Sequence, residues 1–222
     1  MLSVLKDPVA HLLGMTLRPG EIFKRRVVIA LAGLPGSGKS TVAARLAQAV
    51  NARMGTGVMV ALGMDGFHLT REQLANFADP VEAMRRRGSP WTFDADAFAS
   101  KLLALCLRES SVFWPGFEHH VGDPVADAVL VSPAARIVLV EGLYLLHDDH
   151  GWQHHHLFDE SWFLDVPMDV AMDRLVQRHM QANAQSQEAA LQRLALNDRL
   201  NAQIVLKSRD RANWLVQNDT TA

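Results

Sequence analysis

The chain has 222 residues, 49% of them hydrophobic, and a formal net charge of −2 at pH 7. This length suits one domain with a sizeable core, and the near-neutral charge excludes a global basic field for nucleic acid. A single cysteine, Cys106, excludes a disulfide within the chain, and no apolar run reaches the roughly 18 residues of a transmembrane helix. Lys6 and Asp7 interrupt any early apolar run, so we expect a cytoplasmic protein.

Apolar, β-branched stretches alternate with segments of helical spacing, which predicts an α/β fold with a mainly parallel sheet and helices on both faces. Five strands are expected in the sheet, at residues 27–32, 58–62, 137–140, 162–166 and 213–217. Helices are expected at residues 3–14, 39–54, 94–107 and 170–180, and from residues 70 and 187 onward. Residues 112–117 and 128–131 predict a small extra strand pair outside this alternation.

The first predicted strand leads into the run Gly33-Leu34-Pro35-Gly36-Ser37-Gly38-Lys39-Ser40-Thr41. This run fits the phosphate-binding pattern G-x-x-x-x-G-K-[ST] at every fixed position, and a predicted helix follows it. Glycines let the backbone curl around phosphates, so that its N–H groups point at anionic oxygens. Lys39 would reach the β- and γ-phosphates, and the Ser40 hydroxyl would bind Mg²⁺. The alternative is a glycine-rich turn that precedes Lys and Ser by chance. The flanking strand and helix favour a three-layer P-loop NTPase fold that binds a nucleoside triphosphate.

Two carboxylates follow predicted parallel strands. Asp65 comes after residues 58–62, and ligands of open α/β sheets bind beyond such strand ends. A carboxylate there can take a proton from a substrate hydroxyl or bind Mg²⁺. The Asp-Gly pair that Asp65 begins is also typical of a tight turn, and position alone does not decide between these roles. Glu141 ends the strand at 137–140 and predicts a site facing the P-loop, with a turn or capping role as the alternative.

Further stretches carry a resemblance to one family. They are Met64-Asp65-Gly66-Phe67-His68, Arg87-Gly88-Ser89-Pro90-Trp91-Thr92-Phe93-Asp94, Phe117-Glu118-His119 and Val140-Glu141-Gly142-Leu143-Tyr144. Together with the P-loop they resemble the P-loop kinases of the uridine kinase, phosphoribulokinase and bacterial pantothenate kinase group. Within that group the chain looks like the branch of fructose-transport-system sugar kinases or nucleoside/nucleotide kinase-like proteins. The resemblance covers about residues 25–206 and implies ATP and Mg²⁺ as cofactors.

The resemblance also implies roles for single residues. Asp65 matches the catalytic carboxylate, and Glu141 matches the glutamate near Mg²⁺, where Ser40 and Asp65 would also contribute. Arg174 and Arg178 match the arginines of a lid, expected at about residues 168–200, and would act with Lys39 and Asp65 in catalysis. Because these two arginines are spaced i, i+4, they share one helix face. Their alternative is a solvated face with acidic partners.

The candidate acceptor-binding residues are Phe67, His68, Arg87, Trp91, Phe93, Phe117 and His119. Core packing competes for Trp91 and Phe93, because they alternate with polar residues. The run Arg85-Arg86-Arg87 is typical of a solvated helix end, and only Arg87 matches the family motif. Residues 181–187 lack the glycine common after the lid helix in relatives, which leaves the lid's length open.

The expected function is ATP-dependent phosphorylation of a small-molecule hydroxyl acceptor, with a sugar-like acceptor favoured by resemblance alone. A nucleoside or pantothenate-like acceptor stays open, as does a homodimer. A regulatory or GTPase-like module is the other class, and the missing Asn-Lys-x-Asp motif counts against it. No nucleic-acid or membrane partner is expected. A polar surface loop is favoured over a metal site for His147, His150, His154, His155 and His156.

Overall fold

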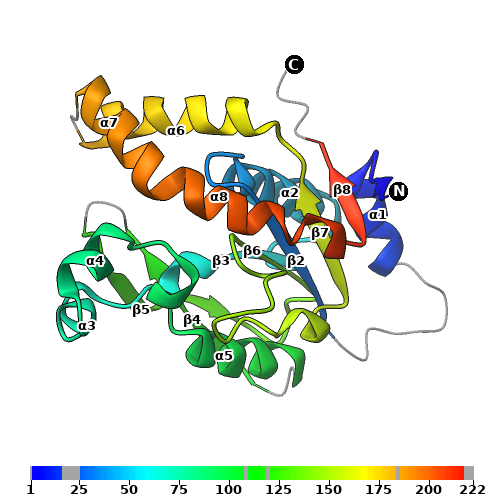
Figure 1. The fold of residues 1–222 in the computed structure, drawn as a ribbon. Coiled ribbons are helices and arrows are strands. Elements are labelled where there is room, and N and C mark those ends of the chain that lie inside the picture. Colours follow the sequence, from blue (N-terminus) through cyan, green and yellow to red (C-terminus); the bar gives the residue numbers. More distant parts are fainter. Residues whose placement is uncertain (1, 17–25, 108–109, 119–120, 184–185, 218–222) are drawn as a thin grey trace.

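The computed structural model describes residues 2–16, 26–107, 110–118, 121–183 and 186–217 (Figure 1). Six strands form one sheet in the order β1-β8-β7-β2-β6-β3, and every neighbouring pair is parallel. These strands are β1 (Ser3–Val4), β2 (Val27–Gly33), β3 (Met59–Gly63), β6 (Ile137–Gly142), β7 (Glu160–Leu164) and β8 (Trp214–Val216). An antiparallel pair lies apart from the sheet and consists of β4 (Val112–Phe117) and β5 (Pro124–Val131). The predicted α/β class, parallel sheet and extra strand pair are confirmed, and β1 adds a sixth strand to the five expected.

The helices are α1 (Pro8–Thr16), α2 (Lys39–Met54), α3 (Arg71–Ala75), α4 (Pro80–Arg85), α5 (Ala95–Leu107), α6 (Met168–Asn183), α7 (Gln187–Arg193) and α8 (Arg199–Leu206). Helix α2 packs against β2, β3 and β6, whereas α5 and α8 also contact β2. Six of the seven β2 residues are buried, because helices cover both faces of this central strand. Within the described part of the chain, no helix is long and apolar enough to cross a bilayer.

The strand order creates a switch point at the carboxyl end of β2, because the chain leaves first to one side of this strand and later to the other. From β2 the chain passes to β3, two positions away, and only later returns to fill the gap with β6 before it crosses to β7. Ligands of open α/β sheets bind beyond the carboxyl ends of the strands at such a point. The register sets Glu141 of β6 beside Leu31 of β2 and Gly63 of β3. The P-loop, Glu141 and the residues after β3 therefore meet at this edge.

The prediction of one helix over residues 3–14 is wrong at its start. Ser3 and Val4 pair with β8 instead, and the Leu5 N–H donates to the Leu215 carbonyl at 2.8 Å. The open edge of β8 offers unpaired backbone groups, which satisfy an extended segment as well as a helix would. Helix α1 then begins at Pro8, whose missing N–H costs nothing at this position.

The segment after β7 forms three helical pieces: α6 lies at the top of Figure 1, and α7 and α8 run from the upper left back toward the centre. Helix α6 is followed by α7, and one wide π-type turn, Leu194–Asp198, joins α7 to α8. We call residues 168–198 the lid. A single π turn inside a helix is uncommon and is frequently found at functional sites.

Candidate active site

The P-loop connects β2 to α2, as predicted. Gly36 and Gly38 adopt φ angles of 80° and 91°, a left-handed conformation that side chains disfavour. The Ser37 N–H donates to the Leu34 carbonyl at 3.1 Å and closes the turn. The loop thus ends on the N-terminus of α2, where unpaired N–H groups favour an anion. This backbone cradle fits a phosphate group.

The back of the P-loop touches the lid. A Cβ on Gly36 would lie 2.2 Å from the Ala171 carbonyl oxygen of α6, so only glycine fits there. Arg174, on the same helix, donates from Nη1 to the Ser37 carbonyl at 3.4 Å. The start of α6 is therefore seated on the phosphate-binding loop, and its position is tied to that of the loop.

Lys39 is buried beneath the loop, and its amine donates to the Leu34 carbonyl at 3.0 Å. Burial lowers the pKa of Lys39, whereas the charges of Glu141 and Asp65 act to raise it. Arg178 of α6 lowers the pKa of Lys39 further. The amine thus lies within the field of both carboxylates and of one lid arginine.

Ser40 and Glu141 bring two oxygen ligands together beside the loop. The Ser40 hydroxyl donates to Glu141 Oε1 at 2.8 Å. Burial raises the pKa of the Glu141 carboxyl, and the positive charge of Lys39 opposes this shift. Hydroxyl and carboxylate oxygens are the ligands that Mg²⁺ takes from proteins. This donor set fits Mg²⁺.

Asp65 lies on a single 3₁₀ turn, Met64–Phe67, directly after β3. Its backbone carbonyl accepts from the His68 backbone N–H at 3.1 Å and from His68 Nδ1 at 2.8 Å. A Cβ on Gly66 would lie 2.2 Å from the Pro115 carbonyl oxygen of β4. The strand pair β4–β5 thus presses on the turn and fixes Asp65 at the end of β3.

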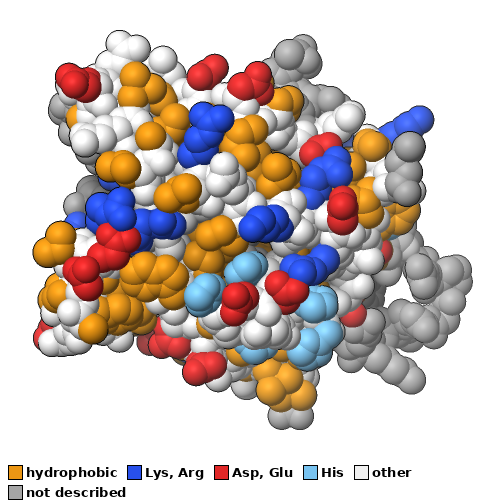
Figure 2. All heavy atoms as spheres, in the orientation of Figure 1, with side chains coloured by type: hydrophobic (Ala, Val, Ile, Leu, Met, Phe, Trp, Pro, Cys, Tyr) orange, Lys and Arg blue, Asp and Glu red, His pale blue; other side chains and the backbone are white. Residues whose placement is uncertain are grey.

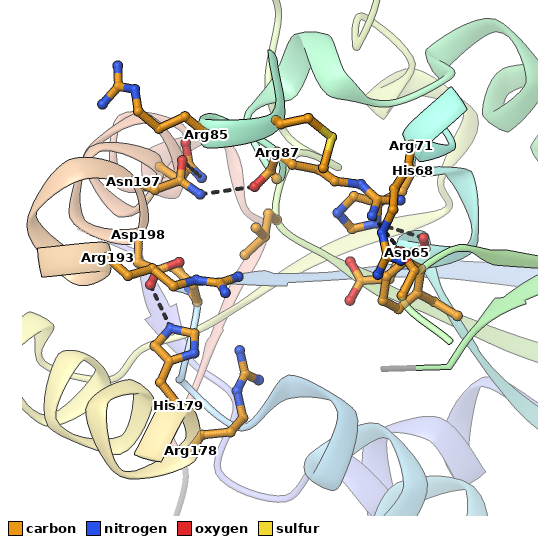
Figure 3. A pocket seen from close by; sticks show the side chains of 17 residues that line it. Asp65, His68, Arg71, Arg85, Arg87, Arg178, His179, Arg193, Asn197 and Asp198 are labelled. Atoms are coloured by element: carbon orange, nitrogen blue, oxygen red, sulfur yellow. Dashed lines mark hydrogen bonds and ion pairs between the residues drawn. The ribbon is translucent and has the colours of Figure 1, made fainter. Parts of the chain in front are cut away.

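A cavity of about 520 Å³ lies between this turn, the P-loop and the lid (Figure 3). It is lined by Pro35, Asp65, His68, Arg71, Met84, Arg85, Arg87, Gly88, Phe117, Gly122, Leu143, Arg178, His179, Arg193, Asn197, Asp198 and Asn201. Five of these residues are arginines, and two are aspartates. The structure therefore brings together six of the predicted site residues: Asp65, His68, Arg87, Phe117, Arg178 and Pro35 of the P-loop.

Three predicted acceptor residues lie outside the cavity lining. Phe67 is buried against Phe98 and Trp114, at ring distances of 5.2 and 4.9 Å. Phe93 is 6% exposed and backs the lining instead, because its ring lies 4.0 Å from that of His68. Trp91 is half-buried and lies near Phe77. His119 falls outside the described residues.

The three consecutive arginines have different environments. Arg85 is exposed and pairs with Glu82, as a solvated helix end would. Arg87 is held inside, where it pairs with Asp123 at 2.7 Å and donates to the carbonyls of Leu69 and Gly122. Because these partners belong to two segments beside the cavity, residues 69 and 122–123, Arg87 holds the two segments together. Pairing of Arg87 was not apparent in the sequence, because Asp123 lies 36 residues away.

A buried polar network joins α8 and the π turn to the segment after α4. Asn201 Oδ1 accepts from Arg86 at 3.1 Å and from the Ser89 hydroxyl at 3.0 Å. Asn197 donates to the Arg87 carbonyl at 2.9 Å. These partners could not be seen in the sequence, because they lie more than 100 residues from Asn197 and Asn201.

Two further lining residues come from the lid and were missed by the sequence reasoning. His179 of α6 lies 2.8 Å from Asp198 of the π turn, and both face the cavity in Figure 3. Arg193 extends from α7 toward the same space. No local motif marks these positions, because they reach one cavity only through the packing of α6 against α7 and the π turn.

The histidines at residues 147–156 lie away from this cavity. Figure 2 shows histidine and acidic side chains side by side on the face drawn there. His147 and His150 stack at 6.2 Å between ring centres. Across the described ranges, no group of three or more His, Cys, Asp or Glu side chains is arranged to hold a metal ion.

Fold and site define a P-loop kinase, and comparisons with known proteins place it in a family. Residues 28–220 match the model of the Phosphoribulokinase / Uridine kinase family, and the chain belongs to this family. It is 40% identical over 196 residues to a Schizosaccharomyces pombe protein named "Putative uridine kinase C227.14", covering 86% of this chain and 83% of that protein. It is 35% identical over 176 residues to "ATP-dependent kinase YFH7" of Zygosaccharomyces rouxii, covering 65% of this chain but only 47% of that protein.

A solved structure agrees with this assignment. The "putative fructose transport system kinase" from Silicibacter sp. superposes with a TM-score of 0.81 at 34% identity. The match covers 95% of this chain and 98% of that one. The chain is thus a small-molecule kinase of the P-loop class, and the family implies ATP and, in most members, Mg²⁺.

Proposed function

We propose that the chain transfers the γ-phosphate of ATP to a hydroxyl of a sugar or sugar-like small molecule. The observation that carries this proposal is the position of Asp65. Its carboxylate lines a cavity of about 520 Å³ that also reaches Pro35 of the P-loop and Arg178 of the lid. A cavity of this size suits a small molecule between a base and a phosphate site.

The nucleotide side of the site consists of residues Gly33 to Thr41. Their backbone N–H groups would hold the phosphates, Lys39 would neutralise them, and Ser40 and Glu141 would bind Mg²⁺. When bound, Mg²⁺·ATP supplies the transferable phosphoryl group and a divalent charge beside it. The hydrogen bond between Ser40 and Glu141 at 2.8 Å supports this assignment, because it already gathers two oxygen ligands.

The acceptor side begins at Asp65. Its carboxylate oxygen would accept the proton of the acceptor hydroxyl as the new O–P bond forms. Lys39 and Arg178 would balance the charge on the transferring oxygens, and Arg174 would hold α6 on the P-loop through the Ser37 carbonyl. Closure of the lid would exclude water, which otherwise competes as the acceptor.

The cavity lining favours a sugar over a nucleoside. Among the described residues, Phe117 is the one hydrocarbon ring in the lining, together with the imidazoles of His68 and His179. Most other lining side chains offer hydrogen-bond donors or acceptors, which suit several hydroxyl groups better than they suit a flat base. A nucleobase site would instead be expected to provide stacking rings.

A coupled ADP-release screen tests the proposal. Sugars, sugar phosphates, sugar acids, nucleosides and pantothenate would each be supplied with Mg²⁺·ATP, and the phosphorylated product would be identified by ³¹P NMR. We expect acceptor-dependent ADP release with a member of the sugar classes. Release only with nucleosides or pantothenate would overturn the acceptor class, and tight ATP binding without release by any acceptor would favour a regulatory module.

A further inference from the structure

The cavity carries more positive charge than phosphoryl transfer alone requires. Its lining includes five arginines and two histidines against Asp65 and Asp198. Three of these cationic or titratable residues have acidic partners: Arg85 pairs with Glu82, Arg87 with Asp123, and His179 with Asp198. Four of the seven remain, His68 and the three arginines Arg71, Arg178 and Arg193, and Asp65 is the lining carboxylate outside these pairs.

Arg178 belongs to the phosphate end of the cavity. Its charge lowers the pKa of Lys39, so its guanidinium acts on the P-loop lysine. Figure 3 shows its side chain rising from α6 into the cavity. Arg178 therefore has a use in the proposed transfer step, whereas Arg71 and Arg193 do not.

Arg71 lies on the opposite wall, against the turn between β4 and β5. The Arg71 guanidinium lies directly against Gly122, where a Cβ would force the arginine side chain to move. Gly122 has a φ of 75°, and its carbonyl accepts from Arg87. The Arg71 backbone N–H donates to Asp123 Oδ1 at 3.0 Å, and the charge of that carboxylate is paired with Arg87. Within the described residues, the Arg71 side chain makes no ion pair or hydrogen bond.

Arg193 approaches from the lid. It lies at the end of α7, and Figure 3 shows its side chain extending toward the cavity that Arg71 lines from the other wall. Its guanidinium likewise has no ion pair or hydrogen bond in the part of the chain that the structure describes. Holding two such groups in one cavity costs electrostatic repulsion, which a bound oxyanion would offset.

We propose that Arg71 and Arg193 form a subsite for an anionic group on the acceptor, a phosphate monoester or a carboxylate. This inference rests on the proposed function and specifies its acceptor: a hydroxyl compound that carries an oxyanion at a distance from the reacting hydroxyl. Asp65 repels the oxyanion and so disfavours the reversed orientation, which leaves the hydroxyl beside Asp65. Forked guanidinium donors match the oxygens of either anionic group.

Binding of inorganic phosphate tests the subsite without knowledge of the acceptor. The P-loop is first filled with Mg²⁺ and a non-hydrolysable ATP analogue, so that its own anion site is blocked. Millimolar phosphate should then shift the side-chain NMR signals of Arg71 and Arg193 in the wild type. Absence of such shifts, or shifts at other arginines alone, would overturn the proposal.

Matched pairs of compounds then distinguish the two anionic groups. D-fructose is compared with D-fructose 6-phosphate, and D-glucitol with D-gluconate, by calorimetry on the same blocked protein. We expect one anionic member to bind at least about tenfold more tightly than its neutral counterpart, because hydrogen bonds to charged groups are the strong ones. Equal affinity within both pairs would contradict the proposal.

Substitutions of Arg71 and Arg193 test whether these two side chains cause the phosphate response and the preference for anionic compounds. Arg71→Gln with Arg193→Gln should abolish both the phosphate response and the anionic preference, and Arg71→Lys with Arg193→Lys should restore part of each. The control is Arg53→Gln, since Arg53 is exposed near the end of α2 and does not line the cavity. Anionic preference that survives the double Gln variant would overturn the subsite. If the ADP-release screen finds a neutral acceptor, the subsite fails while the kinase proposal stands.

Discussion

Beside the P-loop, Lys39 is buried and Glu141 is half-buried. Burial is the first cause of both pKa shifts, upward for Glu141 and downward for Lys39. The folded protein therefore binds a proton at Glu141 more tightly than the unfolded chain does. Above the ordinary pKa of 4.5 and up to the raised pKa of Glu141, the free energy of unfolding should fall as pH rises.

The raised pKa of Glu141 also gives a prediction for the binding of Mg²⁺·ATP. A metal ligand must be deprotonated, so affinity should rise with pH across the same window, by at most about tenfold per pH unit. Calorimetric titrations of the wild type and Glu141→Gln at several pH values measure this. Both proteins share the titration of ATP itself, so the difference between their slopes isolates Glu141. Identical slopes would show that Glu141 does not bind the metal.

The strand pair β4–β5 packs against the turn Met64–Phe67, which carries Asp65, and Gly66 is the point of contact. Ala at position 66 would place a methyl group 2.2 Å from the Pro115 carbonyl oxygen, and the strand pair would have to move. We expect Gly66→Ala to destabilise the protein by about 1–3 kcal/mol, as overpacking does, and to displace Asp65.

Gly14→Ala is the matched control, because a Cβ on Gly14 meets nothing within 4 Å and the residue lies in α1. That substitution should be neutral or stabilising by up to about 1 kcal/mol. Urea denaturation compares the two variants. Equal stability would mean that β4–β5 does not press on the turn.

Helix α8, which continues directly from the lid, is anchored by the amide of Asn201. Its replacement by Ala removes the acceptor used by Arg86 and Ser89, and Ser89 is fully buried. We expect a loss of about 1–3 kcal/mol in the free energy of unfolding, because buried polar groups would be left unpaired. Gln203→Ala, on the exposed side of α8, should stay within about 0.5 kcal/mol. A loss no larger than that of the control would exclude the network as an anchor.

Over the whole molecule, the features that could be predicted from the sequence are those that depend on residues close together in the chain. The glycines at 36 and 38 predicted a loop of unusual backbone conformation, and the loop has it. Asp65 was placed at the end of a parallel strand, and it lines the cavity. Each of these inferences needed only neighbouring residues and the alternation of strands and helices.

The remaining features depend on contacts between distant segments. Arg71 of α3 and Arg193 of α7 line the same cavity, and no spacing rule in the sequence joins them. The sequence pattern around Phe93 agrees with either a pocket residue or a core residue. In the structure Phe93 is buried behind His68, a contact that the sequence alone does not reveal. The strand at Ser3–Val4 forms because β8, near the other end of the chain, offers a free edge.

The role of Asp65 as the catalytic base is tested by comparing acceptor-dependent ADP formation by the wild type and Asp65→Asn. The acceptor is the one found by the screen, and Mg²⁺·ATP affinity and thermal unfolding are measured on the same preparations. Loss of a positioned base should lower kcat by about 10²–10⁴-fold, with affinity for Mg²⁺·ATP and the fold retained. Near-wild-type turnover by Asp65→Asn would show that Asp65 is not the base that accepts the proton of the acceptor hydroxyl.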